Sequence, residues 1–301
     1  MKIGFVGLGK MGSQMVSKLL LAGVEVVVMD RGNEIVQKMK AEGASSATDR
    51  AQMRDMLGAD PIIWLMIPAG VVEEELTLWS EVLPSGATLI DGGNSDWRLT
   101  VLRGERLHAK GIQLMDVGTS GGILGSVNGF SMMIGGTRTL YERVTPILDA
   151  LALPSGGQAY MGKTGSGHYV KMIHNGIEYG MMQSFAEGYR LLKEGPMTDI
   201  PLDAVSAVWQ KGSIIGSTLN ELIVEIMNEN STLTGIDGFV AESGEGRWTL
   251  ETGNSVGVEM PALSAALQVR KESQAGKINY ATKLLAAMRN KFGGHAINKN
   301  T

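Results

Sequence analysis

The 301-residue chain contains no cysteine. This absence excludes disulfide frameworks, cysteine-ligated zinc, iron–sulfur clusters and thiol nucleophiles together. It fits a reducing cytoplasm, where we expect the protein to be located. A basic excess is also lacking, because 27 lysines and arginines stand against 31 aspartates and glutamates, for a net charge of −4. Nucleic-acid binding is therefore disfavoured, whereas an anionic small ligand needs only a few local cations.

Long apolar stretches are missing as well. No segment approaches the ~18 uninterrupted apolar residues of a membrane-spanning helix, and the nearest, residues 62–72, is interrupted by Pro68. The N-terminal apolar run, Ile3–Val6, ends at Gly7 and is too short for a signal peptide. We therefore expect no membrane association, and we interpret this first run as a strand.

Short β-rich runs alternate with helical patterns through the first half of the chain. The runs cover residues 2–6, 24–29, 61–67, 87–90, 112–117 and 131–134, and the helical patterns cover 11–21, 35–41, 71–83, 97–109 and 140–151. This alternation predicts βαβ units and a parallel sheet covered by helices on both faces, a doubly wound α/β domain.

After Tyr160 the strand patterns stop. Helical patterns then cover residues 164–193, 202–214, 218–229, 262–276 and 280–292. The sequence therefore predicts two domains, an α/β domain over residues 1–160 and an all-helical domain over residues 161–301.

A glycine-rich turn follows the first predicted strand. Gly7-Leu8-Gly9-Lys10-Met11-Gly12 has the spacing GxGxxG, and an amphipathic helix begins within it. In this context Gly7 permits the tight turn, Gly9 lets the backbone approach a pyrophosphate, and Gly12 allows close packing of helix on strand. The helix N-terminus faces the phosphates. We therefore predict a Rossmann-type dinucleotide site, the alternative being a glycine-rich turn without a ligand.

The second predicted strand ends at Asp30, roughly 18 residues after the last of these glycines, where an acidic side chain bonds the ribose 2′-hydroxyl of NAD. Arg31 could instead clasp the 2′-phosphate of NADP, or stack on the adenine. A carboxylate beside a phosphate dianion is costly in a partly dry site. We predict NAD as the preferred cofactor and keep NADP open; a plain turn or helix-cap role for Asp30 is the alternative.

One predicted helix carries polar residues where an apolar stripe is usual. Lys171, His174, Asn175, Glu178 and Tyr179 fall at i, i+3, i+4, i+7 and i+8, within an arc of roughly 140°. Over residues 170–183 the only charged residues are Lys171 and Glu178. This pattern indicates a site in which burial tunes a lysine and a glutamate as base and acid. A solvated polar face is the alternative.

With these residues in view, the chain resembles the 6-phosphogluconate dehydrogenase family in its short form, within the β-hydroxyacid dehydrogenase superfamily. The resemblance runs nearly end to end and is most specific over residues 171–179, KMIHNGIEY. The lysine and the asparagine of this segment are shared across the superfamily, whereas its histidine and glutamate resemble the phosphogluconate branch. Residues 91–95, 118–122 and 289–295 resemble further motifs of that branch.

The resemblance implies oxidative decarboxylation of 6-phosphogluconate to ribulose 5-phosphate in the pentose phosphate pathway, without a metal. Lys171 is then the base for the C3 hydroxyl, and Glu178 protonates C1 of the product. The implied substrate residues are Asn94, Ser120, Gly121, Gly122, His174, Asn175, Tyr179, Arg247, Arg270, Arg289 and His295. The cofactor is expected to contact Asn94 and also Ile67, Pro68 and Ala69, which lie at the end of a predicted strand.

Two departures from the family pattern matter. Asp30 and Gly32 flank Arg31 where the family usually has a neutral residue and a threonine, which favours NAD and leaves NADP open. Arg247 stands where longer members commonly have lysine, and either cation can bind phosphate, arginine with a planar fork.

The resemblance also implies an assembly. Arg289 and His295 belong to a tail motif that reaches the phosphate site of a neighbouring subunit. Longer members add a second helical repeat, and this chain stops after one. We therefore expect a homodimer or tetramer, in which the helical domain serves dimerisation and substrate binding and the tail completes the neighbour's site.

Two other functions stay open. A β-hydroxyacid dehydrogenase for 3-hydroxyisobutyrate or a tartronate-type acid needs no phosphate site, and His174, Glu178 and the tail motif argue against it. A non-catalytic dinucleotide sensor needs neither Lys171 nor Glu178.

Overall fold

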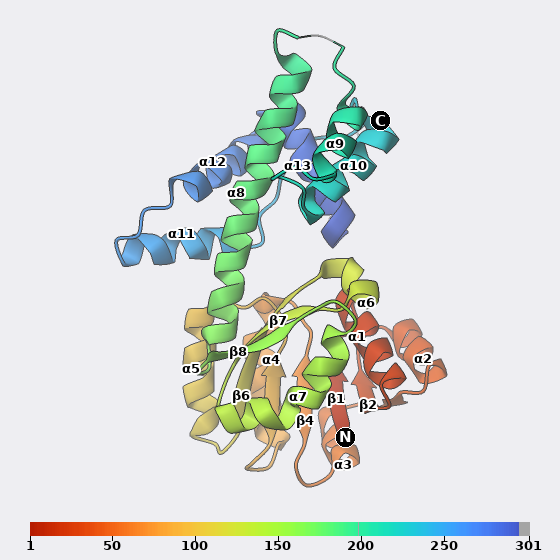
Figure 1. Ribbon diagram of the computed structural model, residues 1–301. Coiled ribbons are helices and arrows are strands. Elements are labelled where there is room, and N and C mark those ends of the chain that lie inside the picture. Colours follow the sequence, from red (N-terminus) through yellow and green to blue (C-terminus); the bar gives the residue numbers. More distant parts are fainter. Residues whose placement is uncertain (198, 295–301) are drawn as a thin grey trace. The chain divides into compact units, whose positions relative to one another are not determined.

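The structure is a computed structural model that describes residues 1–197 and 199–294 (Figure 1). The chain divides into two compact units, of which the first spans Met1–Met172 and the second begins at Ile173. The implied tail residue His295 lies outside the described residues.

An eight-stranded sheet forms the centre of the first unit, all of whose residues are described, with the order β3-β2-β1-β4-β5-β6-β7-β8. The strands are β1 Lys2–Val6, β2 Glu25–Met29, β3 Ser45–Ser46, β4 Ile62–Leu65, β5 Thr88–Asp91, β6 Gln113–Ser120, β7 Ser131–Gly135 and β8 Gln158–Gly162. Neighbouring strands are parallel except β6 and β7, which are antiparallel. The predicted parallel sheet is therefore confirmed except at this pair. The chain between them is too short for a parallel crossover, which needs a dozen or more residues.

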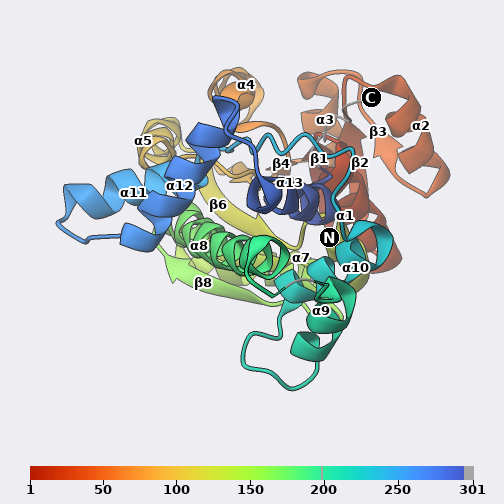
Figure 2. The same ribbon diagram turned by 90° about the horizontal axis from the view of Figure 1, so that it is seen from above.

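Helices cover both faces of this sheet. They are α1 Lys10–Leu21, α2 Asn33–Ala41, α3 Arg50–Leu57, α4 Ala69–Val82, α5 Trp97–His108, the 3-10 turn η1 Gly122–Leu124, α6 Gly125–Asn128 and α7 Arg138–Ala152. The ribbon view shows helices on both sides of the sheet (Figure 2). Apolar side chains of α1, α2 and α7 belong to one core cluster, and those of α3, α4 and α5 belong to the other. The doubly wound prediction is confirmed, because each helix buries an apolar face on strands that are buried from both sides.

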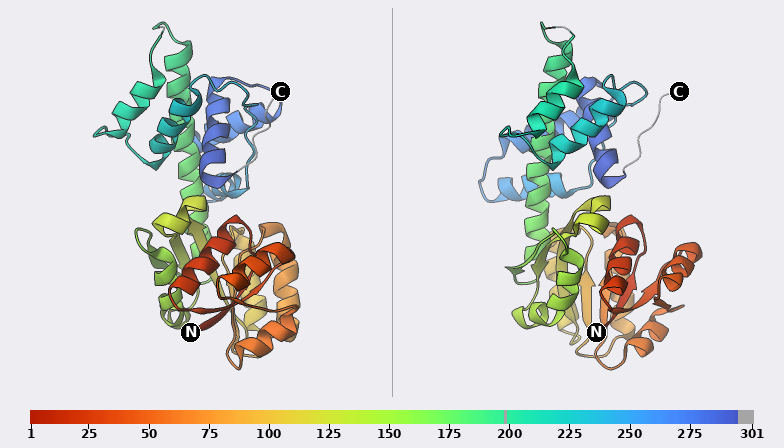
Figure 3. Two further views of the ribbon diagram at one scale, coloured as in Figure 1. Left: turned by 90° about the vertical axis from the view of Figure 1, so that its right-hand side faces the viewer. Right: turned by 45° about the vertical axis from the view of Figure 1, so that its right-hand side comes forward.

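Helices and loops make up the second unit as far as its residues are described. The helices are α8 Ser166–Glu194, which begins in the first unit, α9 Leu202–Gln210, α10 Thr218–Asn230, α11 Glu245–Ser255, α12 Pro261–Gln274 and α13 Tyr280–Gly293. The largest apolar cluster joins α8, α9, α10 and α13, and α9 packs along α10 (Figure 3). The all-helical prediction is confirmed for the described residues. No described helix combines the length and apolar character needed to cross a membrane.

The first turns of α8 pack on the sheet of the first unit. His168 donates its backbone N–H to Asp116 of β6, and a Cβ on Gly167 would overlap the carbonyl oxygen of Met133 in β7. For this reason the division between the compact units falls after Met172, whereas the sequence placed a domain boundary after residue 160, near the end of β8.

Candidate active site

The glycine-rich turn joins β1 to α1. Gly7 has φ 94°, and a Cβ there would overlap the carbonyl oxygen of Met66, so only glycine fits this turn. Gly9 is the N-cap of α1, makes no side-chain cap, and is followed by no acidic residue in the first turn. A Cβ on Gly9 would meet nothing within 4 Å, so this backbone borders open space. Helix N–H groups with no side-chain cap, beside open space, fit the pyrophosphate of a dinucleotide.

Asp30, directly after β2, is bound to this turn. Its Oδ2 accepts a hydrogen bond from the backbone N–H of Leu8 at 2.6 Å, and its Oδ1 accepts one from Gly32 at 2.7 Å. Each carboxylate oxygen can accept more than one hydrogen bond, so ribose hydroxyls can still bind. Asp30 therefore fixes the glycine-rich turn, a role that the sequence did not reveal, while the neighbouring Arg31 is exposed.

The residues after β4 border the same turn. Gly7 lies against Ile67, whose Cγ2 would be 2.9 Å from an added Cβ, and Pro68 is the N-cap of α4, which begins at Ala69. Ligands in open α/β sheets bind at the carboxyl ends of the strands, and β1 and β4 are neighbours. Lys10 is exposed and Met11 half-buried at the start of α1.

The loop after β5 carries Asn94. Asp91, fully buried, accepts hydrogen bonds from the backbone N–H of Gly93 at 3.2 Å and from the Ser95 hydroxyl at 2.7 Å, which holds the loop in shape. The Oδ1 atom of Asn94 is buried and has no hydrogen-bond partner among the described residues. A buried acceptor without a donor is costly, so this atom fits a ligand hydroxyl or amide.

The next strand supplies the predicted carboxylate loop. Ser120 is the last residue of β6, and Gly121, with φ 121°, leads into η1, which begins at Gly122. Thr119 donates its hydroxyl hydrogen to the carbonyl oxygen of Gly92 at 3.3 Å, so this loop is tied to the loop after β5. The two predicted loops therefore lie at the same edge of the sheet.

Lys171 lies on α8 against β6 and is 5% exposed. A Cβ on Gly118 would overlap the Cβ of Lys171, so the lysine side chain starts directly above the strand, two residues before Ser120. A solvated lysine is thus excluded in this structure. Because the aliphatic part of the Lys171 side chain is buried, few directions are open to the ammonium group at its end.

The same helix continues with the other polar residues. His174 Nδ1 lies 3.0 Å from Asn175 Oδ1 and 3.9 Å from Glu178 Oε2. The Glu178 side chain is 23% exposed, and Tyr179 is buried. Lys171 and Glu178 belong to the single helix α8, Lys171 in its part within the first unit and Glu178 in its part within the second.

Two buried arginines lie near Tyr179 within the second unit. The guanidinium carbon of Arg270 is 3.6 Å from the centre of the Tyr179 ring, and its Nη1 donates to the carbonyl oxygen of Ala241 at 3.2 Å. Its Nη2 is buried with no hydrogen-bond partner among the described residues. Burial lowers the pKa of Arg270 to about 10, with the charge of Arg289 adding to the effect. Burial likewise lowers the pKa of Arg289. An anion would offset this cost, so the pair fits a phosphate.

Arg289 lies on α13 and is 7% exposed within its own chain, where its charge interacts with Tyr179, Glu245 and Glu178. Helix α13 belongs to the core of the second unit, in which Met288 is fully buried. The contact of Arg289 with a neighbouring subunit, which the resemblance implies, stays a prediction.

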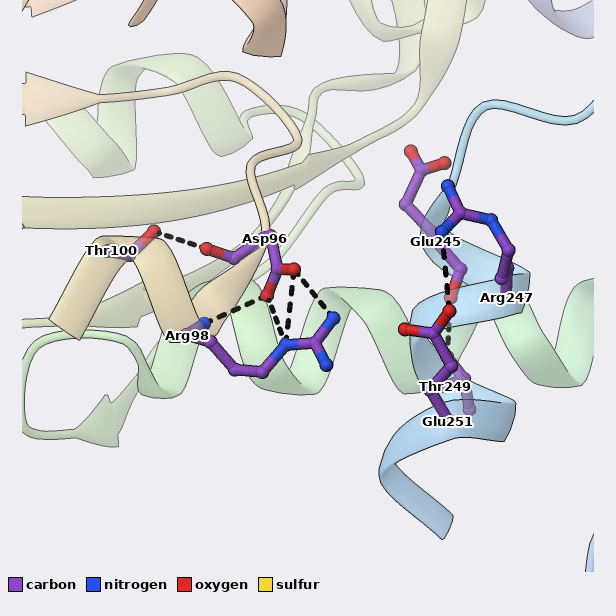
Figure 4. Close-up of polar contacts among 7 residues, drawn as sticks. All are labelled: Asp96, Arg98, Thr100, Glu245, Arg247, Thr249 and Glu251. Carbon is purple, nitrogen blue, oxygen red and sulfur yellow. Dashed lines mark hydrogen bonds and ion pairs between the residues drawn. The ribbon is translucent and has the colours of Figure 1, made fainter. Parts of the chain in front are cut away.

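Arg247 is already paired. Its Nε donates to Glu242 at 3.1 Å. Its Nη1 donates to Glu251 at 3.3 Å (Figure 4). These carboxylates, Glu242 first, raise the pKa of Arg247. A phosphate would have to compete with two carboxylates for this half-exposed guanidinium.

Several buried polar residues escaped the sequence analysis. Asp116, Glu245 and Thr100 are buried, and no local pattern marks them, because their burial depends on contacts with distant segments. No group of three or more His, Cys, Asp or Glu side chains among residues 1–197 and 199–294 is arranged to hold a metal ion.

Together, the fold and the glycine-rich turn define a dinucleotide-binding protein of the Rossmann class with a helical second half. Residues 2–162 match the NAD binding domain of 6-phosphogluconate dehydrogenase, and residues 167–277 match the C-terminal domain of 6-phosphogluconate dehydrogenase. The chain belongs to the 6-phosphogluconate dehydrogenase family, and the resemblance noted from its motifs is confirmed.

Individual relatives agree with this assignment. A Haloferax volcanii protein named as an NAD(+)-dependent, decarboxylating 6-phosphogluconate dehydrogenase is 40% identical over 299 residues, covering 99% of this chain and 98% of that protein. A Bacillus subtilis enzyme with the same name is 33% identical over 285 residues, covering 89% of this chain but 60% of the relative.

Solved structures show the same fold. The Plasmodium falciparum 6-phosphogluconate dehydrogenase has a TM-score of 0.82 at 28% identity, and the match covers 92% of this chain and 63% of that one. A Mycobacterium tuberculosis 3-hydroxyisobutyrate dehydrogenase has a TM-score of 0.73 at 19% identity, which shows a shared fold alone. The chain therefore spans about three fifths of the longer relatives.

Proposed function

We propose that this protein oxidises and decarboxylates 6-phospho-D-gluconate to D-ribulose 5-phosphate and CO2, with NAD as the preferred acceptor and NADP as the poorer one. The observation that carries the proposal is Lys171, which is buried against β6 on α8, the helix that also carries the partly buried Glu178. Family membership and the NAD-dependent Haloferax relative support it.

The cofactor is held by backbone N–H groups of residues 7–12, with Asp30 at the adenosine ribose and the loop residue Asn94 nearby. A bound nicotinamide would supply the acceptor for the hydride that leaves C3 of the substrate. Lys171, in its neutral form, takes the proton of the C3 hydroxyl, so that C3 becomes a ketone. Its position against β6 keeps this amine out of bulk water.

The resulting β-keto acid loses CO2, because the electrons of the broken C1–C2 bond flow toward the C3 ketone. Protonated Lys171 gives its proton to that oxygen, which leaves an enediol. Glu178 then protonates the carbon that lost CO2, which becomes C1 of the product, while Lys171 takes back the hydroxyl proton. Lys171 thus acts as base, acid and base in turn, and Glu178 acts as an acid.

The substrate phosphate is assigned to Tyr179, Arg270 and Arg289, with Arg247 as a further candidate. The unpartnered Nη2 of Arg270 supports this assignment, since a phosphate oxygen is a strong acceptor for it. His174 and Asn175 are assigned to substrate hydroxyls. The loop after β5 and residues 120–122 are assigned to the substrate carboxylate and C3.

A homodimer or higher oligomer is also proposed. Helix α8 exposes Ile177, Met181 and Leu191 at 58%, 43% and 68%, in line along one face, with small Ser184 and Gly188 between them. An exposed apolar stripe on a long helix favours packing against another helix. A monomer in light scattering at micromolar concentration would contradict this. The proposed tail contact of His295 to a neighbouring subunit stays part of this proposal.

Two further predictions remain proposals. One is the division into domains over residues 1–160 and 161–301, which the helix start at Ser166 supports in part. The other is the cytoplasmic location, because the proposed substrate and cofactor are anions that do not cross a membrane unaided; cell fractionation tests it.

Reduction of NAD in the presence of 6-phosphogluconate, 3-hydroxyisobutyrate or no substrate tests the function. We expect NADH to form only with the phosphosugar acid, together with one CO2 for each NADH. Turnover of 3-hydroxyisobutyrate without turnover of the phosphosugar would favour the other dehydrogenase class. Cofactor binding without turnover of either acid would favour a sensor.

A further inference from the structure

A fully buried aspartate of the sheet lies at the start of helix α8. The Oδ1 atom of Asp116 accepts a hydrogen bond from the backbone N–H of Gly165 at 2.6 Å, and its Oδ2 accepts one from His168 at 2.9 Å. N–H groups in the first turn of a helix have no partner within the helix, and a carboxylate also meets the positive end of its dipole. One side chain of β6 therefore holds the beginning of α8 at two points.

The backbone around this contact leaves little room for another position of the helix. A Cβ on Gly167 would overlap the carbonyl oxygen of Met133 and lie 2.7 Å from that of Asp116. A Cβ on Gly135 would overlap the Asp116 carboxylate. The helix and two strands thus pack backbone to backbone, and the carboxylate fills the space between them.

A second element holds the same turn. The Thr100 hydroxyl of α5 lies 2.8 Å from Nδ1 of His168, whose side chain is 1% exposed. Thr100 also lies 3.1 Å from the carbonyl oxygen of Asp96, the contact drawn in Figure 4. Both the backbone and the side chain of His168 are therefore fixed, by different elements of the first unit.

We propose that Asp116 is a positioning residue for Lys171. Lys171 follows His168 by three residues, in the next turn of the same helix, and its Cβ rests on Gly118, two residues beyond Asp116 in β6. A helix transmits a displacement of its first turn to the next, so the Asp116 carboxylate sets where the lysine side chain begins. This inference rests on the proposed role of Lys171 as proton acceptor, and it gives Asp116 no contact with substrate.

The variant Asp116→Asn tests the proposal, because it keeps the shape but can accept only one of the two N–H groups. We expect kcat with 6-phosphogluconate to fall about 10- to 100-fold, as small misplacements of a catalytic group do. The KM for NAD should stay within about twofold. The deuterium isotope effect on kcat with substrate deuterated at C3 should rise, since the chemical step becomes slower relative to product release.

The matched control is Asp49→Ala. The Asp49 side chain accepts from the Gln52 backbone N–H at 2.9 Å at the start of α3, in the same unit, and α3 carries no proposed site residue. This variant should lower Tm and leave kcat and the isotope effect unchanged. It separates loss of a helix-start carboxylate in general from loss of the one below Lys171.

Unchanged kcat and isotope effect in folded Asp116→Asn would overturn the proposal, and so would a parallel loss of NAD affinity. If that variant does not fold, hydrogen exchange of the wild-type protein decides: the Gly165 and His168 amides should exchange slowly, and fast exchange overturns the contact. Wild-type protein that does not oxidise 6-phosphogluconate contradicts the proposed function itself. An active wild type, an inactive Lys171→Met and a fully active Asp116→Asn contradict only this inference.

Discussion

The two units present contrasting ways of meeting an anionic ligand. The first unit offers backbone N–H groups at Gly9 and the start of α1, next to open space. The second unit offers two buried guanidinium groups, Arg270 and Arg289, whose pKa values burial lowers. Backbone dipoles carry no net charge and need no counterion when the ligand is absent, whereas buried cations destabilise the unliganded state. Substitutions that weaken ligand binding should therefore affect stability differently in the two units. Only in the second unit does such a substitution also remove a buried charge that destabilises the unliganded protein.

Lys171→Met should give the largest effect. It sharpens the comparison of the two units, because it removes the proposed base and leaves both anion sites in place. We expect kcat to fall by about 10²- to 10⁴-fold, the range for loss of a positioned base. NAD affinity, measured by fluorescence or calorimetry, should stay unchanged. Retained turnover would remove Lys171 as the base.

Arg270→Met should raise the KM for 6-phosphogluconate by about 100-fold, since a charge-assisted contact to phosphate is lost. It should not lower the free energy of unfolding. The folded-state pKa of Arg270, about 10, lies below its usual value, so the charged form is disfavoured on folding by about 3 kcal/mol at neutral pH. That cost is full below pH 10 and diminishes as the pH rises above it.

Arg247→Met is the matched control for this second-unit prediction. Because Arg247 is half-exposed and bound to Glu242 and Glu251, we expect a KM change of less than about tenfold. Steady-state kinetics and thermal unfolding measure both variants. A larger KM effect at Arg247 than at Arg270 would contradict the ranking drawn from burial.

Gly9→Ala tests the backbone site of the first unit. The added Cβ would enter open space, so Tm should change little while NAD affinity falls about 30-fold because the pyrophosphate loses its close approach. Gly7→Ala, in contrast, should destabilise the fold, since φ is 94° and the Cβ would overlap Met66. Calorimetric titration and thermal unfolding distinguish the two. Unchanged NAD affinity in Gly9→Ala would place the pyrophosphate elsewhere.

Asp30→Asn should give the smallest effect. We expect the ratio of kcat/KM for NAD over NADP to fall about fivefold, because the amide no longer repels a 2′-phosphate. NAD efficiency itself should fall slightly, since the hydrogen bond to Leu8 weakens. A wild-type preference for NADP would overturn the argument from Asp30.

Much of the fold follows from local patterns. The alternation of strand and helix patterns predicted the doubly wound sheet. The spacing of apolar residues indicates an element with one buried face, and a continuous apolar run indicates a strand that is buried on both faces. Helix α3 was missed because its composition is polar, although Asp49 followed by Gln52 is a helix-start signal. Helix α11 was missed because glycine and threonine interrupt its pattern. Strand β7 is antiparallel to β6 because the connection between them is short. Strand patterns alone do not specify the direction of a strand in its sheet.

The candidate site divides in the same way. The GxGxxG spacing and the polar stripe of α8 could be found in the sequence, because each lies within a short, continuous stretch of the chain. The bond from Asp30 to Leu8 and the pairing of Arg247 could not be found, since each joins groups that only folding brings together in a particular geometry.

The sequence by itself determined the class of this protein: a glycine-rich turn at the start of a first helix, an acidic residue after the second strand, and one helix with ionisable groups on a single face. Only the tertiary structure decided which charges are buried and what they meet. In the folded protein Lys171 packs against Gly118, Asp116 binds the backbone at the start of α8, and the Arg270 guanidinium lies over the Tyr179 ring. The reason is that local patterns depend on neighbours in the chain, whereas desolvation and charge pairing depend on neighbours in space.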